Sequence, residues 1–290
     1  MTSTCELIGI NRQVYYRAQK SKEKKQMIAV QVIDLVNGIR KKMPKLGTKK
    51  LYHKLKKALK DLGVGRDKLF DILRANSLLI KPKKQYHITT DSHHRFKKHK
   101  NLVENLEIKR PEQVLVSDIT YVGNRDYPMY LALITDAYSK KIMGYDLSNS
   151  LGAEGATLAL KMAIKNRIYP ESDLIHHSDR GVQYCCDLYQ KVLKKAKIKC
   201  SMTERYDPYQ NAVAERINGI LKQEFIGDVK IRDIGLMKLL IENSIEIYNQ
   251  ERPHYSNFML TPEEMHLQSK IKMRTYKKQK TEYQNDLVLS

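Results

Sequence analysis

The sequence has few cysteines, no tryptophan and no long apolar run. Four Cys in a chain of 290 residues are too few for a disulfide framework, so we expect reduced thiols in a cytosolic protein. No stretch reaches the roughly 18 consecutive apolar residues that a membrane-spanning helix needs. The first residues, MTSTCELIGINRQ, carry no basic cap followed by a long apolar stretch, so a secretory signal is not expected.

Acidic residues are scarce in the first third of the chain. Residues 1–110 hold 28 Lys and Arg against 9 Asp and Glu, whereas residues 111–290 hold 25 against 23. The whole chain carries a net charge of +21, which favours a polyanionic partner. An anionic membrane surface is the competing interpretation. The uneven distribution indicates a part that grips nucleic acid, joined to a part with another task.

The N-terminal third has a helical pattern. Residues 5–17 (CELIGINRQVYYR) place a Gly and an Asn between two short apolar runs, as in a helix-turn-helix. Further helices are expected over 26–42, 51–62 and 66–76, the second of them capped by Thr48. Short helices with Lys-rich outer faces are typical of a small DNA-binding module. A surface that is basic only for solubility is the alternative.

The segment that follows, residues 81–100, is polar, basic and weakly patterned. We interpret it as a linker that can also touch phosphates. It contains His87, His93, His94 and His99. These do not have the spacing of a four-ligand zinc site, and no Cys lies nearby.

From residue 110 onward the pattern alternates between strands and helices. It predicts strands over 114–122, 130–137, 141–147, 173–177 and 198–202. It predicts helices over 153–167, 182–195, 212–225 and 237–250, and a capping pattern at Thr261-Pro262-Glu263-Glu264. Three hairpin-connected strands followed by alternating helices and strands imply an α/β fold with a mixed five-stranded sheet and flanking helices. This is also the order of ribonuclease H-like folds.

These patterns divide the chain into five expected segments. They are a helical, helix-turn-helix-like DNA-binding region (1–80), a basic linker (81–110), a ribonuclease H-like catalytic core (111–226), a C-terminal helical extension of the core (227–268) and a basic tail (269–290).

Three acidic residues fall where such a fold would gather them. Asp118 lies in the middle of the first predicted strand, where a carboxylate is costly without a partner or a metal. Asp179 follows the fourth strand in HHSDRG, where Gly181 allows a tight turn, and ligands gather at strand ends in open α/β sheets. Glu215 lies one turn into the helix over 212–225. Asp136 also lies near a strand end, and we assign it a structural or supporting role.

The spacing of the three carboxylates and the segments around them are more specific than the residue types alone. Sixty residues separate Asp118 from Asp179, and 35 separate Asp179 from Glu215. The flanking segments are SDITYV, HSDRGVQY and DPYQNAVAERINGILKQE, followed later by YNQERPH and TPEE. Over about residues 30–265 the chain resembles the second-reading-frame (OrfB) transposase of the IS-three family of insertion sequences, in the superfamily of DDE transposases and retroviral integrases.

The resemblance implies metal-dependent DNA chemistry. Cleavage and transfer of a phosphodiester need charge neutralisation at phosphorus, which two Mg²⁺ ions held by carboxylates can supply, and Mn²⁺ can substitute. By resemblance, Asp118 would bridge both ions, while Asp179 and Glu215 would each hold one. Water would attack to nick the element's end, and the freed 3′-hydroxyl would attack in strand transfer.

A further set of residues is expected to meet the DNA. Asn211, Glu215, Asn218 and Lys222 share one helix face, because they are spaced by four, three and four. On this face Asn211 and Asn218 would approach the DNA end, and Lys222 would meet a phosphate. Two further expected contacts are Thr120, which shares a strand face with Asp118, and Arg180, which can equally form a salt bridge.

Two departures from the family pattern leave the expected metal ligands intact. Leu115 stands where the family often has Trp, and an apolar exchange is tolerated there. Gly219 lies inside the catalytic helix at a cost of about 1 kcal/mol relative to Ala.

Other readings of the sequence stay open. They are a retroelement-type integrase, a non-catalytic DNA-binding protein on a repurposed transposase fold, and a nuclease that cleaves without joining. The helix-turn-helix near Cys5 looks cut by the start of the chain. In the resembling family, frameshifting fuses an upstream DNA-binding frame to this one, so we expect the fusion to be the active form. We also expect a homodimer or higher oligomer on element-end and target DNA, no membrane partner, and a cytoplasmic, nucleoid-associated location.

Overall fold

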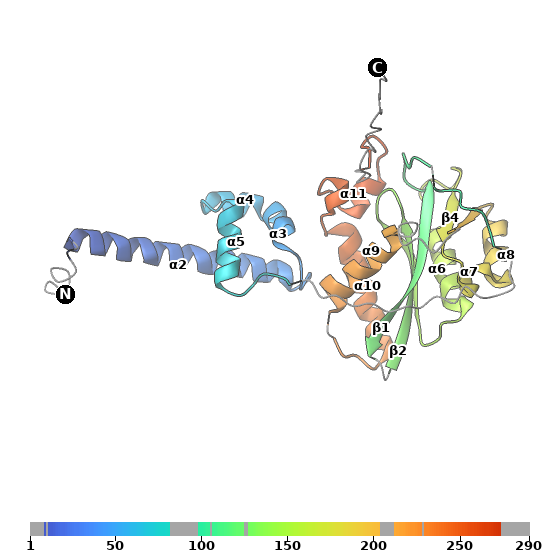
Figure 1. Ribbon diagram of the computed structural model, residues 1–290, viewed down its shortest axis with the longest axis horizontal. Helices are drawn as coiled ribbons and strands as arrows, with labels where there is room; N and C mark the ends of the chain where they lie inside the picture. The colour runs from blue at the N-terminus through green and yellow to red at the C-terminus, as the bar shows by residue number, and fades with distance from the viewer. Residues whose placement is uncertain are drawn as a thin grey trace, which may run out of the picture.

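The computed structural model is made of a helical part followed by a sheet with helices on both faces (Figure 1). The residues it describes are 9, 11–81, 98–104, 106–124, 127–203, 212–227 and 229–273. None of the helices within these ranges is long and apolar enough to span a bilayer.

The N-terminal helical module, residues 11–81, begins with one long helix. Its elements are α2 (Arg12–Arg40), α3 (Thr48–Lys54), α4 (Lys56–Asp61) and α5 (Arg66–Ala75). Asn11 caps α2, because its side chain accepts a hydrogen bond of 2.8 Å from the Gln13 amide.

Two details of the sequence reading are wrong in this module. The sequence predicted two helical segments here, one ending at residue 17 and the next beginning at residue 26. The structure has a single helix instead, because α2 runs through residues 18–25 (AQKSKEKK), which contain neither Gly nor Pro. Thr48 does not cap the next helix, because Gly47 holds the cap position and Thr48 is buried in the first turn. The beginning of the expected helix-turn-helix, before Gly9, lies outside the described residues.

The five-stranded mixed sheet that the sequence predicted is confirmed. Its strands are β1 (Val114–Asn124), β2 (Tyr127–Asp136), β3 (Ile142–Ser148), β4 (Ile175–Ser178) and β5 (Lys199–Met202). They are ordered β3-β2-β1-β4-β5. The β1/β2 and β2/β3 pairs are antiparallel, and the β1/β4 and β4/β5 pairs are parallel. This is a ribonuclease H-like sheet, with β1 at its centre.

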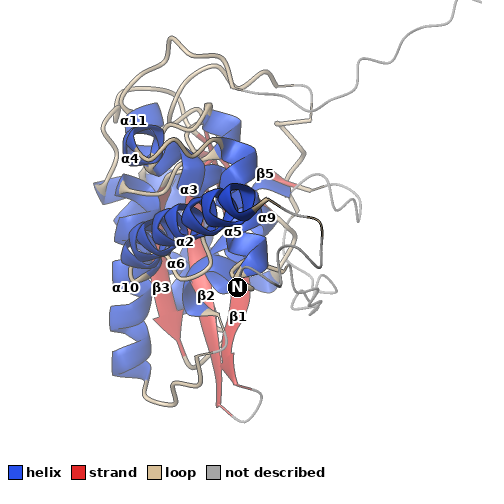
Figure 2. Cartoon of the chain, turned by 90° about the vertical axis from the view of Figure 1, so that its left-hand side faces the viewer, coloured by secondary structure: helices blue, strands red, loops and turns tan. Residues whose placement is uncertain are grey.

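Helices cover both faces of the sheet (Figure 1). On one face lie α6 (Ala153–Lys165), α7 (Val182–Cys185) and α8 (Asp187–Lys195). On the other lie α9 (Ala212–Ile220), α10 (Ile234–Gln250) and α11 (Pro262–His266), with a short 3₁₀ turn, η2 (Tyr255–Asn257), before α11. Seen from the side of the module, the helices of the module lie in front of this second layer (Figure 2).

Two predicted helices differ from the observed ones. The helix expected over 182–195 breaks at Cys186, whose backbone is extended. The helix expected over 212–225 is α-helical only to Ile220 and continues as a π-helix, η1 (Leu221–Ile226). Each hydrogen bond of a π-helix spans one more residue than in an α-helix, and such segments are frequent at functional sites.

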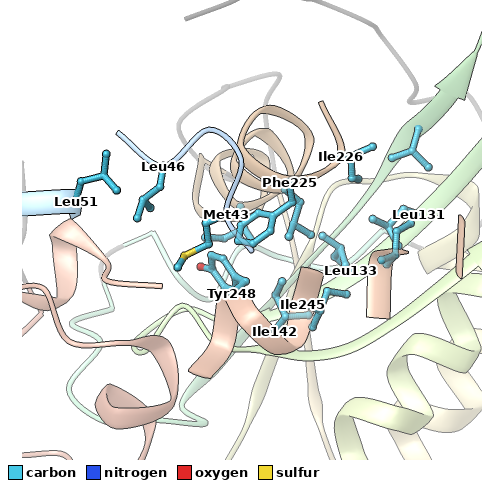
Figure 3. Close-up of a cluster of buried hydrophobic side chains, with 14 of the residues drawn as sticks. Met43, Leu46, Leu51, Leu131, Leu133, Ile142, Phe225, Ile226, Ile245 and Tyr248 are labelled. Atoms are coloured by element: carbon cyan, nitrogen blue, oxygen red, sulfur yellow. The ribbon is translucent and has the colours of Figure 1, made fainter. Parts of the chain in front are cut away.

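The helical module shares a hydrophobic cluster with the second helix layer. Met43 and Leu46 of the module lie beside Phe225 and Tyr248, and Leu51 lies beyond Leu46 in the same cluster (Figure 3). Each of these five side chains is at most 5% exposed. The module therefore packs on η1 and α10 and is not merely tethered to the core.

Buried charges fasten α11 to the start of the sheet. Glu112, fully buried, accepts hydrogen bonds from Arg167 Nε at 3.0 Å and from the Ile168 amide at 2.6 Å. Its backbone amide donates to Asp136 at 2.7 Å, which confirms the structural role predicted for Asp136. His266, the last residue of α11, has Nε2 at 3.3 Å from Glu112. The network explains why the C-terminal extension stays on the core.

The predicted capping pattern at the start of α11 is also confirmed. The Thr261 side chain accepts from the Glu264 amide at 3.2 Å, and the Glu264 carboxylate accepts from the Thr261 amide at 2.8 Å. Pro262 occupies the first turn, where a missing N–H costs nothing.

Candidate active site

Asp118 and Asp179 come from neighbouring parallel strands. In the register of β1 and β4, Val116 lies opposite His177. Each aspartate follows two residues later, so the two carboxylates arise at the same end of the sheet and on the same face. Because β4 ends at Ser178, Asp179 already belongs to the turn that follows.

The turn after β4 fixes the Asp179 side chain. The Gly181 amide donates to Asp179 Oδ1 at 2.9 Å. A Cβ at position 181 would lie 3.0 Å from the same oxygen and 2.9 Å from Gln183 Oε1. Glycine at position 181 leaves room for the ends of both side chains, which would otherwise have to shift, and the chain turns at this point as predicted.

Glu215 is brought to the site by α9. The preceding residue, Ala214, is buried in a cluster with Val114 and Val116 of β1, which holds the first turn of α9 against the central strand. The Glu215 side chain is exposed. Partial loss of hydration and the charge of Asp179 raise the pKa of the Glu215 carboxyl. The three predicted carboxylates thus interact with one another.

Asn218 makes the shortest contact of the site. Its Nδ2 donates to Asp118 Oδ2 at 2.6 Å, and its side chain is buried. Burial and the charge of Asp179 raise the pKa of Asp118 to about 7, against the opposing effect of the Asn218 hydrogen bond, and Glu215 contributes to the rise. Asp118 is therefore a carboxylate that lacks sufficient positive charge around it.

Lys222 supplies positive charge from the next turn. It is half-buried at the start of η1, one turn after Asn218. Burial lowers the pKa of Lys222, while the nearby Asp118 charge raises it. In the described part of the chain, no three His, Cys, Asp or Glu side chains converge closely enough to hold a metal ion.

The other residues predicted to contact DNA have different surroundings. Thr120 is almost fully buried within β1. Arg180 is half-buried directly after Asp179. Asn211 lies outside the described residues. Contact of these residues, and of Asn218 and Lys222, with DNA stays a prediction.

Tyr184 borders the site and was not singled out from the sequence. It is 3% exposed, and its buried hydroxyl has no hydrogen-bond partner among the described residues. Burial, then the charges of Asp179 and Asp118, raise the pKa of Tyr184 well above its ordinary value. Its ring stands edge-on to Tyr189, with centroids 5.4 Å apart. In sequence it resembles any core aromatic of a short helix, so no pattern could have identified it.

Comparison with known proteins agrees with this geometry. Two integrase core domain families match the chain, over residues 108–208 and 196–262. An insertion element IS600 uncharacterized 31 kDa protein from Shigella sonnei is 31% identical over 86% of this chain and 92% of its own length. The transposase InsF for insertion sequence IS3A from Escherichia coli K12 is 31% identical over 66% of this chain and 67% of its own length.

Solved structures also align with the chain. The HTLV-2 integrase catalytic core domain in complex with magnesium aligns with 54% of this chain and 97% of its own, at 17% identity and a TM-score of 0.43.

The sheet order, the placement of the carboxylates and the family matches define an integrase-type core. Within that class, the chain belongs to the IS-three family of insertion-sequence transposases.

Proposed function

We propose that the chain is the DDE catalytic subunit of its insertion sequence, a polynucleotidyl transferase that nicks the element's 3′ ends and joins them to target DNA. One observation carries the proposal. Asp118 and Asp179 arise at the same end of two parallel strands, and α9 packs Glu215 against the same strand, so that the three carboxylates repel one another. Carboxylates that raise one another's pKa at one end of a sheet are typical of functional sites.

The donor set fits hard divalent cations. Mg²⁺ prefers carboxylate oxygens and keeps several waters, so three carboxylates suffice as protein ligands. The mutual repulsion that raises the pKa of Asp118 to about 7 is the kind that a bound cation would relieve. Because the three side chains do not converge closely enough to hold an ion in the structure described, we propose that Asp118, Asp179 and Glu215 draw together around two Mg²⁺ ions, for which Mn²⁺ can substitute. When bound, the ions would activate the attacking oxygen and neutralise charge at phosphorus.

Two neighbours of the carboxylates would prepare the site. The Asn218 amide donates to Asp118 Oδ2 at 2.6 Å and so keeps one oxygen of the carboxylate oriented. Asn218 would turn from Asp118 toward the DNA end once a cation takes over that oxygen. Lys222, one turn further, would contact a phosphate of the DNA as a point charge.

The N-terminal third of the chain, which contains the helical module, would supply most of the attraction for DNA. Residues 1–110 carry 28 Lys and Arg against 9 Asp and Glu, so their field attracts the phosphate backbone. A helix-turn-helix-like role for residues 1–80 would place a basic helix against DNA. We also propose a dimer or higher oligomer on paired ends, and a fusion with an upstream-frame DNA-binding protein as the fully active form. These last two proposals rest on the family resemblance.

The test is a nicking assay on a labelled duplex carrying a terminal repeat of the element that encodes the chain. Wild-type protein, alone and as the upstream-frame fusion, is incubated with Mg²⁺, Mn²⁺ or EDTA. We expect 3′-strand nicking with either metal and none in EDTA. Asp118→Asn, Asp179→Asn and Glu215→Gln should each lower the rate by a factor of about 1,000 or more, since each would remove a metal ligand.

Asp173→Asn is the matched control, because Asp173 is an exposed carboxylate that pairs with Lys199 at the surface. It should nick at the wild-type rate. Full activity of the three site variants would show that the site is wrongly assigned. Binding of end DNA without nicking in any metal would favour a non-catalytic DNA-binding protein.

A further inference from the structure

A second charged cluster lies at the C-terminal half of the helical stretch that carries Glu215. Glu224 is in η1, two residues after Lys222. Arg252 grips it with two hydrogen bonds of 2.7 Å, from Nε to Oε2 and from Nη2 to Oε1. The Arg252 side chain is only 2% exposed and the Glu224 side chain 15%. Such a two-pronged pair fixes the carboxylate in orientation as well as in position.

The helical module supplies the third member of the cluster. Lys50 of α3 donates from Nζ to Glu224 Oε1 at 2.7 Å, with only 18% of its side chain exposed. The same glutamate is held through its backbone, because the Lys45 amide donates to the Glu224 carbonyl at 3.2 Å. One residue of η1 therefore joins the core to two residues of the module. We call Lys50, Glu224 and Arg252 the Glu224 clamp.

Charge and packing reinforce the clamp. Although burial would raise the pKa of Glu224, hydrogen bonds and charges from Arg252 and Lys50 lower it, so the carboxylate stays ionised. The Arg252 guanidinium lies 5.5 Å from the centre of the Tyr248 ring. Phe225, next to Glu224, packs in the cluster that the module shares with the core (Figure 3). Removal of Glu224 would leave the buried Arg252 charge without its carboxylate partner, and removal of Lys50 would cut the side-chain link to the module while the Arg252 pair stays.

The clamp acts on the helix that carries the active site. Glu215, Asn218 and Lys222 lie on the continuous stretch formed by α9 and η1. Glu224, the central residue of the clamp, lies in the second half of that stretch. A π-helix is a poorly favoured conformation that persists only where its surroundings hold it. A shift of η1 would therefore move Lys222 directly and Asn218 through the preceding turn.

We propose that Glu224 is a positioning residue through which the helical module, by way of Lys50, holds the catalytic helix in register with Asp118. The inference rests on the proposed function, and it adds that docking of the module is a condition for chemistry, in addition to DNA binding. DNA contacts that move the module would then change the position of the catalytic helix through Lys50 and Glu224.

The first arm of the test needs no catalysis. Hydrogen exchange of the full chain is compared for Lys50→Met, Lys50→Arg and Lys49→Met. Lys49→Met is the matched control, because it removes the same charge from the adjacent, exposed position of α3. In peptides spanning residues 212–227, Lys50→Met should exchange faster by a factor of about ten, Lys50→Arg by much less, and Lys49→Met at the wild-type rate. Equal exchange in Lys50→Met and Lys49→Met would overturn the proposal.

The second arm measures nicking of terminal-repeat DNA at saturating DNA concentration, with the dissociation constant determined separately. Glu224→Gln should lower the rate about tenfold or more and change the dissociation constant less than threefold. The matched control is Glu242→Gln, an exposed glutamate of α10. A Glu224→Gln rate equal to that of Glu242→Gln would also overturn the proposal. If wild-type protein does not nick DNA, the proposed function fails, while the exchange arm still decides whether the clamp holds the helix.

Discussion

Replacement of the central carboxylate, Asp118→Asn, should abolish activity and yet stabilise the metal-free protein. In the fold, burial and the charge of Asp179 raise the pKa of Asp118 from 3.8 to about 7. A carboxyl whose pKa is raised on folding stabilises the protein below the pKa of the unfolded chain, and this contribution is lost as the pH rises through the pKa of the folded state. The loss therefore falls between about pH 4 and pH 7.

The magnitude follows from the size of the rise. Each tenfold change in proton affinity corresponds to about 1.4 kcal/mol, so a change from 3.8 to about 7 sets an upper limit of about 4 kcal/mol. Asp118 is not fully buried by surface area and keeps some hydration. We therefore expect Asp118→Asn to raise the free energy of unfolding by about 1 to 3 kcal/mol at pH 8.

The assay is urea denaturation of both proteins in EDTA at pH 4 and pH 8. The stabilisation should be present at pH 8 and nearly absent at pH 4, where the wild-type carboxyl is protonated in the fold. Added Mg²⁺ should stabilise the wild type at pH 8 and leave Asp118→Asn almost unchanged, since binding to the folded state alone adds to stability. The electrostatic reasoning would be refuted if the difference in free energy of unfolding between Asp118→Asn and wild type were no larger at pH 8 than at pH 4.

Three further outcomes test other parts of the account. Gly144→Ala should cost about 3 kcal/mol or more in urea denaturation, because the new Cβ would meet the α6 backbone, with Ala163 N at 2.7 Å. Glu112→Gln should lower the free energy of unfolding by about 3 to 5 kcal/mol at pH 7, since it leaves the buried Arg167 charge unmatched. Although burial opposes the shift, hydrogen bonds lower the pKa of Glu112 from 4.5 to about 2, so this difference should shrink as the pH falls below 4.5. Lys222→Met should weaken binding of terminal-repeat DNA and reduce the slope of log affinity against log salt by about 1, whereas loss of Glu215 should leave that slope unchanged.

The mixed sheet could be predicted from local pattern, and the meeting of Asp118 with Asp179 followed from the ribonuclease H-like order of its elements. Three strands joined by short turns must form an antiparallel meander, and a strand that returns through a helix must run parallel to its neighbour. With Asp118 in the central strand and Asp179 just past its parallel neighbour, the two carboxylates have to share one end of the sheet.

The contacts that organise the site could not be predicted in the same way. Asn218 has the spacing of an exposed helix face, yet it is buried against Asp118, one hundred residues away in sequence. Arg252 and Lys50 likewise meet at Glu224 from distant segments. Periodicity assigns a residue to a face, whereas its partner depends on how elements pack. The π-helical continuation of α9 was likewise not predicted, because its own sequence favours an ordinary helix.

Joining of an exposed DNA end tests the central claim most directly. Two otherwise identical terminal-repeat duplexes, already nicked, are offered with plasmid target and Mg²⁺, one with a 3′-hydroxyl and one with a 3′-deoxy end. The account predicts covalent joining of the 3′-hydroxyl end by wild-type protein, no joining of the 3′-deoxy end, and no joining by Asp118→Asn. Joining of the 3′-deoxy end, or undiminished joining by Asp118→Asn, would contradict it.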